Sequence, residues 1–531
     1  MVATVAVLAA LLGAACGGGA STTSAPQDPG NAPAGNPAKA AYTPGAKVIA
    51  DSDFRPKEHG FPFENYGKVL RDGSTPANLT AADMRTMFGD RVCADAKAGK
   101  CDLVPEAQTW LDSANREMAA GHCYGFSVAA QQLWQGKLNA ATFGAPDISR
   151  LDLARNQPLQ RLIAYDWATQ LLDSVRSEAV TGSPSQVLDR LRAELTPHPS
   201  ELYTVLIFKR DGRGGHAVTP YAIEDKGGGM SNLLVYDNNW PTVTRAITFN
   251  TKNDTWKYDA AVNPKAKTEL YDGDTKSSTI ALLPITPGLG TQECPFCGKR
   301  WRAQNSTGAV TSAGNPAPAM EEVYLDGSDT DHADLLITDD EGRRFGYVNG
   351  QLVQEIPGAH VEQMVADQDW AENTEPHFFV PAGQTYRVLV DGSALKRPDK
   401  ETVGLIGPSY DVAVQDVTMR PGDKDTLVVT ADDATVTYTT SRPKPWTLAA
   451  GVSDEAADYS VDVRAVSDGR HKTITLALPV DAGTLLLSRP GATGPSTVRL
   501  TVTRETEDGV QSFNRNVRLQ GAQQATQSLT P

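Results

Sequence analysis

The chain has 531 residues, of which 40% are hydrophobic, and it carries a formal net charge of −15 at pH 7. An acidic chain without clusters of lysine and arginine is not suited to bind nucleic acid or anionic lipid through charge. Its length allows several domains, at about 150 residues for each. We therefore expect an acidic, multidomain protein that has no nucleic-acid partner.

The N-terminus predicts export. Residues 2–15 form the apolar run "VATVAVLAALLGAA", which ends at Cys16. The run is shorter than the about 20 residues that a membrane-spanning helix needs, and it has the length of the apolar part of a secretory signal. A cysteine directly after Gly13, Ala14 and Ala15 resembles the lipobox of bacterial lipoproteins, whose cysteine receives a lipid. Cleavage at a small-x-small site followed by simple secretion is the alternative.

The segment after Cys16 predicts a tether. Residues 17–49 are mostly glycine, proline, serine, threonine and alanine, and such a composition buries too little surface to fold. We expect a signal at 1–16, a disordered tether at 17–49, and a body on the outer face of the cell membrane or secreted. The only membrane contact expected is the possible lipid anchor at Cys16.

Helices are predicted from residue 80 to about residue 195. Thr80 and Asp83 form an N-cap box for a short helix through Phe88. Pro105 begins a second helix, whose apolar residues recur at helical spacing. A third helix follows Cys123, and stronger helical patterns cover residues 158–175 and 183–195.

From about residue 202 the apolar spacing becomes that of strands. Short β-rich runs, among them "LYTVLIF", "HAVTPYAIE" and "NLLVYD", alternate with turns rich in glycine and aspartate. Helices followed by antiparallel strands indicate an α+β domain in which the two kinds of element are segregated. We expect this domain to cover residues 50–290.

The C-terminal part predicts β-sandwiches. Residues 291–320 contain "CPFC" and the linker-like "STGAVTSAGNPAPA", and residues 321–531 show strand-like alternation with almost no helical pattern. One or two all-β sandwich domains are expected there, as a spacer or binding region. The acidic turn from Asp326 to Asp331 resembles a calcium loop, but it lacks the glycine and final glutamate of an EF-hand, so a solvated turn is favoured. We expect no metal and no cofactor.

The cysteine count indicates one special thiol. The six cysteines are Cys16, Cys93, Cys101, Cys123, Cys294 and Cys297. An exported protein pairs its thiols, and the spacings favour the disulfides Cys93–Cys101 and Cys294–Cys297. Alternatives for "CPFC" are half of a zinc ribbon, which needs a second ligand pair, or a redox dithiol, which needs a strand before it and a helix after it. Cys123 is then the odd cysteine, which points to reactivity.

A histidine and an acidic strand end suit this thiol. In "GHCYGFS" Cys123 opens a helix, where the macrodipole and the first backbone N–H groups favour a thiolate and stabilise an oxyanion. His216 opens one strand and the next strand ends in "VYDNNWP", so His216 should lie beside Asp237 and Asn238. Because neighbouring residues on a strand face opposite ways, only one of these two meets His216, and charge favours Asp237 over Asn238.

These three segments resemble the papain-like cysteine peptidases, in which a nucleophile at the start of a helix is followed by a histidine and then an asparagine or aspartate on strands. The bacteriocin-processing peptidases place an aspartate where this chain has Asp237. The resemblance implies cleavage of peptide or isopeptide bonds in a peptide or protein substrate. Residues 46–78 would either join the fold or cover its cleft as a propeptide.

The glutamine that precedes the cysteine in these peptidases and completes their oxyanion hole has no direct equivalent. Glu117 occupies the corresponding spacing, and Gln108 and Asn115 are the amides within reach. Gly121 and Gly125 are expected to leave room for the substrate.

Other functions compatible with these residues are a transglutaminase-like acyl transferase and an inactive papain-like scaffold that binds or adheres at the surface. A transglutaminase-like domain usually has its cysteine and histidine closer in sequence. In a scaffold, Cys123 would be a small buried hydrophobe and His216 a hydrogen-bonded strand residue. The sequence does not determine the oligomeric state.

Overall fold

A computed structural model describes residues 41–530, apart from 96–100, 211–214, 262–264, 266, 298–318, 328–330, 363–376, 432–434, 454–456, 466–472, 479–482 and 507–508. The predicted signal with Cys16, most of the tether and most of the linker lie outside the described residues, as does the centre of the acidic turn. The chain divides into two compact units, with the first up to Leu79 and over Ala114–Gln292. The second comprises Thr80–Ser113, Glu293–Glu362 and Asn373–Pro531. Residues 80–113 thus group with the second unit, whereas the sequence-based division placed them in the first.

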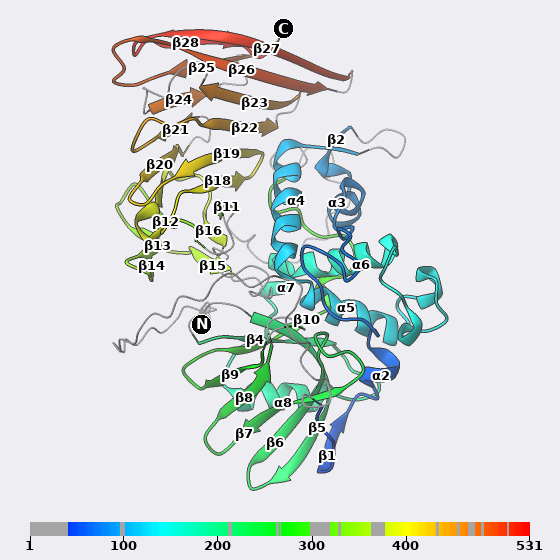
Figure 1. The fold of residues 1–531 in the computed structure, drawn as a ribbon. Helices are drawn as coiled ribbons and strands as arrows, with labels where there is room; N and C mark the ends of the chain where they lie inside the picture. The colour runs from blue at the N-terminus through cyan, green and yellow to red at the C-terminus, as the bar shows by residue number, and fades with distance from the viewer. Residues whose placement is uncertain are drawn as a thin grey trace, which may run out of the picture. The chain divides into compact units, whose positions relative to one another are not determined.

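The first unit contains one antiparallel sheet of eight strands, drawn mostly in green in Figure 1. Seven strands run in the order β10-β4-β5-β6-β7-β8-β9, and β1 pairs with β5. The strands are β1 (Lys47–Asp51), β4 (Tyr203–Phe208), β5 (Gly215–Gly227), β6 (Met230–Tyr236), β7 (Thr244–Asn250), β8 (Thr255–Ala260), β9 (Glu269–Asp274) and β10 (Ile280–Pro284). Its α-helices are α2 (Pro56–His59), α5 (Cys123–Trp134), α6 (Gln157–Ala168), α7 (Asp173–Arg176) and α8 (Pro184–Glu194).

Helices pack on both faces of this sheet because successive strand residues alternate between faces. On β6, Leu233 and Val235 belong to the core that contains α8, whereas Leu234 and Tyr236 belong to the core that contains α5. The helix starts agree with the sequence analysis, since Ser183 caps α8 and accepts a hydrogen bond from the Gln186 N–H. Apart from β1, the α-helices of this unit precede its antiparallel strands along the chain, and the unit has a mixed α/β fold.

The N-terminal residues of this unit are part of the fold. Strand β1 pairs with β5, and the Phe61 N–H donates to the Tyr236 hydroxyl over 3.2 Å. A further bond joins the Asn65 N–H to the Asn238 carbonyl at 3.0 Å. Residues 46–78, which the sequence analysis assigned either to the fold or to a propeptide, therefore contact the end of β6, next to Asp237 and Asn238.

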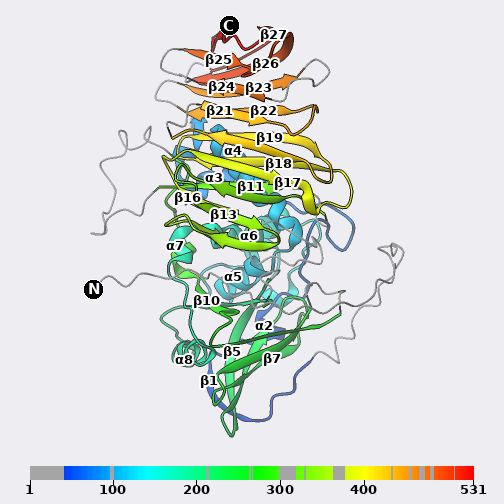
Figure 2. The ribbon, with the colours of Figure 1, turned by 90° about the vertical axis from the view of Figure 1, so that its left-hand side faces the viewer.

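The second unit is a β-sandwich whose two sheets each have nine strands. One sheet has the order β15-β16-β11-β18-β19-β22-β23-β26-β27 and the other β14-β13-β12-β17-β20-β21-β24-β25-β28, and Figure 2 shows the later strands in successive rows. A single cluster of buried apolar residues extends from Val323 to Leu529. Of the two predicted possibilities, one sandwich or two, the single continuous core agrees with one sandwich.

Strand hairpins alternate between the two sheets along the chain. The strands are β11 (Met320–Asp326), β12 (Asp334–Thr338), β13 (Arg344–Val348), β14 (Gln351–Gln354), β15 (His360–Glu362), β16 (His377–Pro381), β17 (Tyr386–Asp391), β18 (Asp399–Gly407), β19 (Tyr410–Met419), β20 (Lys424–Val429), β21 (Thr435–Thr439), β22 (Thr447–Ser453), β23 (Asp458–Ala465), β24 (Thr473–Ala477), β25 (Thr484–Ser488), β26 (Pro495–Thr506), β27 (Gly509–Gln520) and β28 (Ala525–Ser528).

The second unit also holds a short helical segment from earlier in the chain. It contains α3 (Ala81–Phe88), the two-stranded β2 (Cys93–Asp95) and β3 (Asp102–Leu103), and the first part of α4 (Pro105–Glu117). Phe88, Trp110 and Phe296 pack ring against ring, with centroid distances of 5.4–5.8 Å. The predicted capping box of Thr80 and Asp83 is present at the start of α3.

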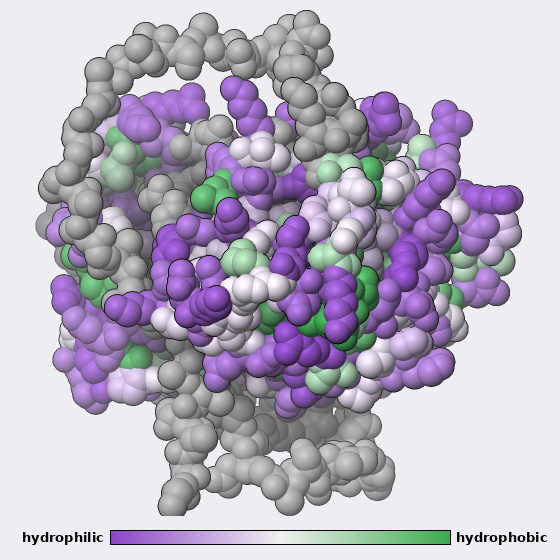
Figure 3. Space-filling model, turned by 90° about the horizontal axis from the view of Figure 1, so that it is seen from below, coloured by the Kyte–Doolittle hydropathy of each residue, from purple (hydrophilic) through white to green (hydrophobic). Residues whose placement is uncertain are grey.

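Both predicted disulfides are confirmed. Cys93 is bonded to Cys101 and Cys294 to Cys297, which indicates an oxidising environment. Among the described residues, no helix combines the length and apolar character required to cross a membrane. The face shown in Figure 3 is dominated by hydrophilic side chains, in keeping with the acidic composition.

Candidate active site

Cys123 is the first residue of α5, and its side chain is fully buried. Among the described residues, Cys123 is the one cysteine that does not form a disulfide. The helix start is held from outside, because the N–H of His122 donates to the side-chain oxygen of Asn65 at 2.9 Å. Cys123 in "GHCYGFS" thus begins a helix, as expected from the sequence, and its thiol lies at the positive end of that helix.

His216 and Asp237 lie in direct contact beside this helix start. His216 is the second residue of β5, and Asp237 directly follows β6, the neighbouring antiparallel strand. The distance from His216 Nε2 to Asp237 Oδ1 is 2.8 Å, and both side chains are 0% exposed. The remaining ring nitrogen, Nδ1, is the atom available to Cys123, whose thiol acts on the ring and helps to raise the pKa of His216.

The charges of this group depend on its partners. Burial lowers the pKa of His216, but the attraction of Asp237, the hydrogen bond to it and the contact with Cys123 outweigh burial and raise the pKa well above its usual value. Burial in turn raises the pKa of Asp237, and the opposing effect of His216 brings that pKa below its usual value. An imidazolium and a carboxylate are therefore favoured at neutral pH.

Asn238 has a different role from Asp237, as the alternation of side chains predicted. Its Nδ2 donates to the carbonyl of Cys123 at 3.1 Å and to the carbonyl of Ala217 at 3.0 Å. This amide joins the end of β6 to the first turn of α5 and to β5. Asp237 is thus the neighbour of His216, and Asn238 fastens the helix that carries Cys123.

The two amides expected near the thiol are occupied elsewhere. Gln108 is exposed on α4 and donates to Asp112 at 2.9 Å. Asn115 binds Leu79 twice, accepting from its N–H at 3.0 Å and donating to its carbonyl at 3.1 Å. Both amides thus serve local structure, because each is already bound to a neighbour.

The two glycines also differ from the expectation that they leave room for substrate. A Cβ at position 125 would lie 2.0 Å from the Ile163 carbonyl oxygen, so Gly125 is required for the close packing of α5 on α6. Gly121 ends the helical segment before Cys123 with φ of 121°, a conformation that other residues rarely adopt. Their function is to set the position of α5.

Asn65 is a site residue that sequence reasoning did not identify. Its Oδ1 accepts from the N–H groups of Tyr66 and His122, both at 2.9 Å, and its buried Nδ2 has no hydrogen-bond partner. An amide donor is therefore left beside the residue that precedes the thiol. Asn65 lies far upstream in "ENYG", and no local pattern links that stretch to Cys123.

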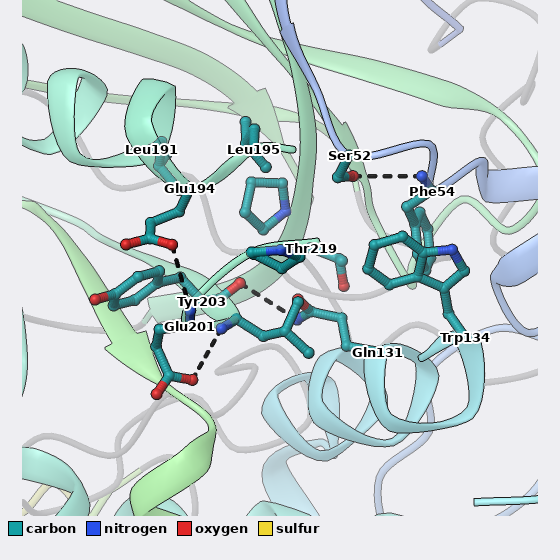
Figure 4. A pocket seen from close by; sticks show the side chains of 13 residues that line it. Ser52, Phe54, Gln131, Trp134, Leu191, Glu194, Leu195, Glu201, Tyr203 and Thr219 are labelled. Atoms are coloured by element: carbon teal, nitrogen blue, oxygen red, sulfur yellow. Dashed lines mark hydrogen bonds between the residues drawn. The ribbon is translucent and has the colours of Figure 1, made fainter. Parts of the chain in front are cut away.

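The pocket in Figure 4 is separate from these groups. It is lined by side chains from α5, α8, β4 and β5, among them Gln131, Trp134, Glu194 and Tyr203. Gln131 is eight residues beyond Cys123, or about 12 Å along the helix axis. It donates to the carbonyls of Ser127 and Tyr203, so it binds the helix to β4 rather than serving the thiol.

Comparison with known proteins adds no assignment. No protein-family model, no curated protein and no solved structure matches this chain. Within the described residues, no group of three or more histidine, cysteine, aspartate or glutamate side chains is arranged to hold a metal ion. The site is thus interpreted from its own geometry.

Proposed function

We propose that the chain is an exported thiol hydrolase, a papain-like cysteine peptidase that cleaves peptide or isopeptide bonds. The observation that carries the proposal is the arrangement of Cys123, His216 and Asp237, with a thiol at a helix start and an imidazole held by a carboxylate at 2.8 Å. Such an order of nucleophile, base and orienting acid is the arrangement that activates cysteine nucleophiles. The two disulfides support an exported location.

In this proposal each group has a step. The Cys123 thiolate attacks the carbonyl carbon, a sulfur–carbon bond forms, and the carbonyl π electrons move to oxygen. His216 then gives its Nδ1 proton to the leaving amine as the carbon–nitrogen bond breaks, which leaves a thioester. Water attacks the thioester while His216 takes a proton from it, and the thiolate is released with the acid product.

The oxyanion needs hydrogen-bond donors that are already in place. The first turn of α5 supplies backbone N–H groups, because the first N–H groups of a helix have no partner within it. The side-chain donor in this proposal is Asn65 Nδ2, which is buried and without a partner and belongs to the amide that binds the His122 N–H. In this proposal Asn65 takes the place of the glutamine that precedes the cysteine in papain-like peptidases and completes their oxyanion hole.

A second candidate, an inactive scaffold that binds a partner, is favoured by one observation. The side chains of Cys123, His216 and Asp237 are all 0% exposed, so a substrate carbonyl reaches the sulfur only after a covering group moves. In a binding module these three residues would instead form a buried polar connection that holds α5 against the sheet. Chemical labelling separates the two functions.

The test is labelling of the full chain by a peptidyl epoxide that alkylates active-site thiolates, followed by peptide mapping. We expect a single label, on Cys123, which Cys123→Ala removes. His216→Ala should slow labelling about 100-fold or more, since a positioned acid–base group contributes that much. The matched control is His198→Ala, an exposed histidine of the same unit, which should label at the wild-type rate. Absence of a Cys123 label in the wild-type chain would favour the scaffold.

A further inference from the structure

Asp237 has two further partners besides His216. Tyr258, on β8, donates its hydroxyl to Asp237 Oδ2 at 2.5 Å. The Asn239 N–H donates to the other oxygen, Oδ1, at 3.0 Å, where His216 also binds. Both oxygens of this buried carboxylate are therefore engaged, and the group has no freedom to rotate away from the imidazole.

Arg245, on β7, supports Tyr258 in turn. Its Nε donates to the Tyr258 hydroxyl at 3.0 Å, and its guanidinium lies 4.0 Å from the centre of the Trp240 ring. It also donates to the Asp259 carbonyl, and it is 4% exposed. A buried guanidinium is costly unless it is paired and stacked, so its presence beside an active-site carboxylate requires an explanation.

The charges alternate along this connection. His216 and Arg245 are cations with Asp237 between them, and the Trp240 N–H donates to the Asp237 carbonyl at 2.9 Å. The titratable or charged groups that act on this network are Cys123, Tyr236, Asp259, Arg245 and Tyr258. Arg245 and the Tyr258 hydroxyl both draw negative charge from Asp237, and both help to lower its pKa.

We propose that Tyr258, supported by Arg245, is a positioning residue that fixes Oδ2 of Asp237, and that the two residues limit how strongly Asp237 retains the proton of His216. The proposal rests on the proposed function, in which protonated His216 pairs with the Cys123 thiolate and protonates the leaving amine. Without the hydrogen bond from the Tyr258 hydroxyl, the Asp237 carboxylate would be more basic and would bind the imidazolium more strongly. His216 would then keep its proton to a higher pH. The two residues thereby set the alkaline limit of the thiolate–imidazolium pair.

The test is a pH titration of the His216 imidazole by nitrogen NMR in the full chain with labelled histidine, with the signal assigned from His216→Ala. Tyr258→Phe should raise the titration midpoint by about one pH unit, because Asp237 loses a charge-assisted hydrogen bond that stabilises its carboxylate. Arg245→Gln should move it in the same direction. The alkaline limit of Cys123 alkylation should follow.

The matched control is Tyr271→Phe. Tyr271 is a buried tyrosine on β9 and is the direct cross-strand partner of Tyr258. Its substitution should leave the His216 midpoint in place. A midpoint that Tyr258→Phe leaves unchanged or lowers would overturn the inference, as would an equal shift from Tyr271→Phe. Failure of the proposed function would appear separately, as a wild-type Cys123 that is not alkylated while His216 still titrates as expected.

Discussion

One buried carboxyl group in the first unit and two in the second have pKa values that are shifted in opposite directions. Asp237 in the first unit receives hydrogen bonds from His216, Tyr258 and a backbone N–H, and its pKa is below the usual value. Glu106 in the second unit accepts from Ser453 at 3.0 Å, and burial raises its pKa to about 8. Burial likewise raises the pKa of Asp411, bonded to Thr109, to about 6.

The difference shows that burial alone does not make a carboxyl group functional. A buried acid that has cations and several donors stays charged and is able to orient a base. A buried acid with few donors becomes neutral instead, and it makes stability depend on pH. The first arrangement is found where we propose chemistry, and the second where the start of α4 contacts β19 and β22.

The largest contrast is expected between Asp237→Asn and Glu106→Gln. Asp237→Asn removes the charge that holds the imidazolium, so the rate of Cys123 alkylation at neutral pH should fall about 100-fold. Glu106→Gln replaces a group that is already neutral and should leave the rate unchanged. The measurement is the second-order rate constant for the peptidyl epoxide. Equal losses in both variants would show that the effect of Asp237→Asn arises from general destabilisation.

The contributions of Glu106 and Asp237 to stability should depend on pH with opposite signs. The folded pKa of Glu106 lies above its unfolded value of 4.5, so its contribution is full below pH 4.5 and declines as pH rises to about 8. The lowered pKa of Asp237 gives stability that is present above pH 3.8 and is lost as pH falls. Calorimetry from pH 5 to 8 should show the second unit losing a few kcal/mol, to which Glu401, with a pKa of about 8, also contributes.

The control for this trend is Glu106→Gln, which cannot titrate. It should stabilise the second unit at pH 8 and leave it nearly unchanged at pH 5. A wild-type second unit with the same unfolding temperature across this range would contradict the assignment of neutral carboxyl groups.

A smaller effect is expected from Gly451→Ala in β22. The new Cβ would lie 2.1 Å from Asp411 Oδ1 and 2.3 Å from the Pro105 Cβ, so the start of α4 would have to move. Overpacking of this kind costs roughly 1–3 kcal/mol, which should lower the unfolding temperature of the second unit alone. Gly494→Ala is the control, because its Cβ would meet no atom within 4 Å. Equal shifts from both variants would refute the close contact.

The smallest expected effect concerns a chain truncated to residues 46–307. Cys123, His216 and Asp237 lie in the first unit, as do Tyr258 and Arg245. The truncated chain retains all five, so Cys123 should keep its reactivity. The start of α4 loses Ser453 and Asp411, so amide exchange in residues 105–113 should become faster than in the full chain. Unchanged exchange there would show that α4 does not depend on the β-sandwich.

Much of the site followed from local rules. The disulfides and the odd cysteine came from counting, and the contact of His216 with Asp237 came from antiparallel strands joined by a turn. Tyr258 and Asn65 were not found, because their proximity depends on the register of β8 and on the path of the N-terminal segment over the sheet. These are long-range features that no short sequence pattern encodes.

The fold shows the same limit. Strand alternation predicted an all-β region, but the single core that joins its two nine-stranded sheets depends on how the hairpins alternate between sheets. The grouping of residues 80–113 with that region rests on contacts such as Glu106 with Ser453, which are 347 positions apart. Neither helix periodicity nor capping carries that information.

The most direct test of the central claim is the alkylation rate of Cys123 against pH in wild type, Asp237→Ala and Asn238→Ala. If Asp237 holds the imidazolium, its removal should lower the pH at which His216 loses its proton, and the reactive range should narrow from the alkaline side. Asn238→Ala should leave that range in place, although it removes two buried hydrogen bonds and should cost about 1–3 kcal/mol of stability. The reverse pattern, or no change from either variant, would contradict a Cys123–His216–Asp237 site.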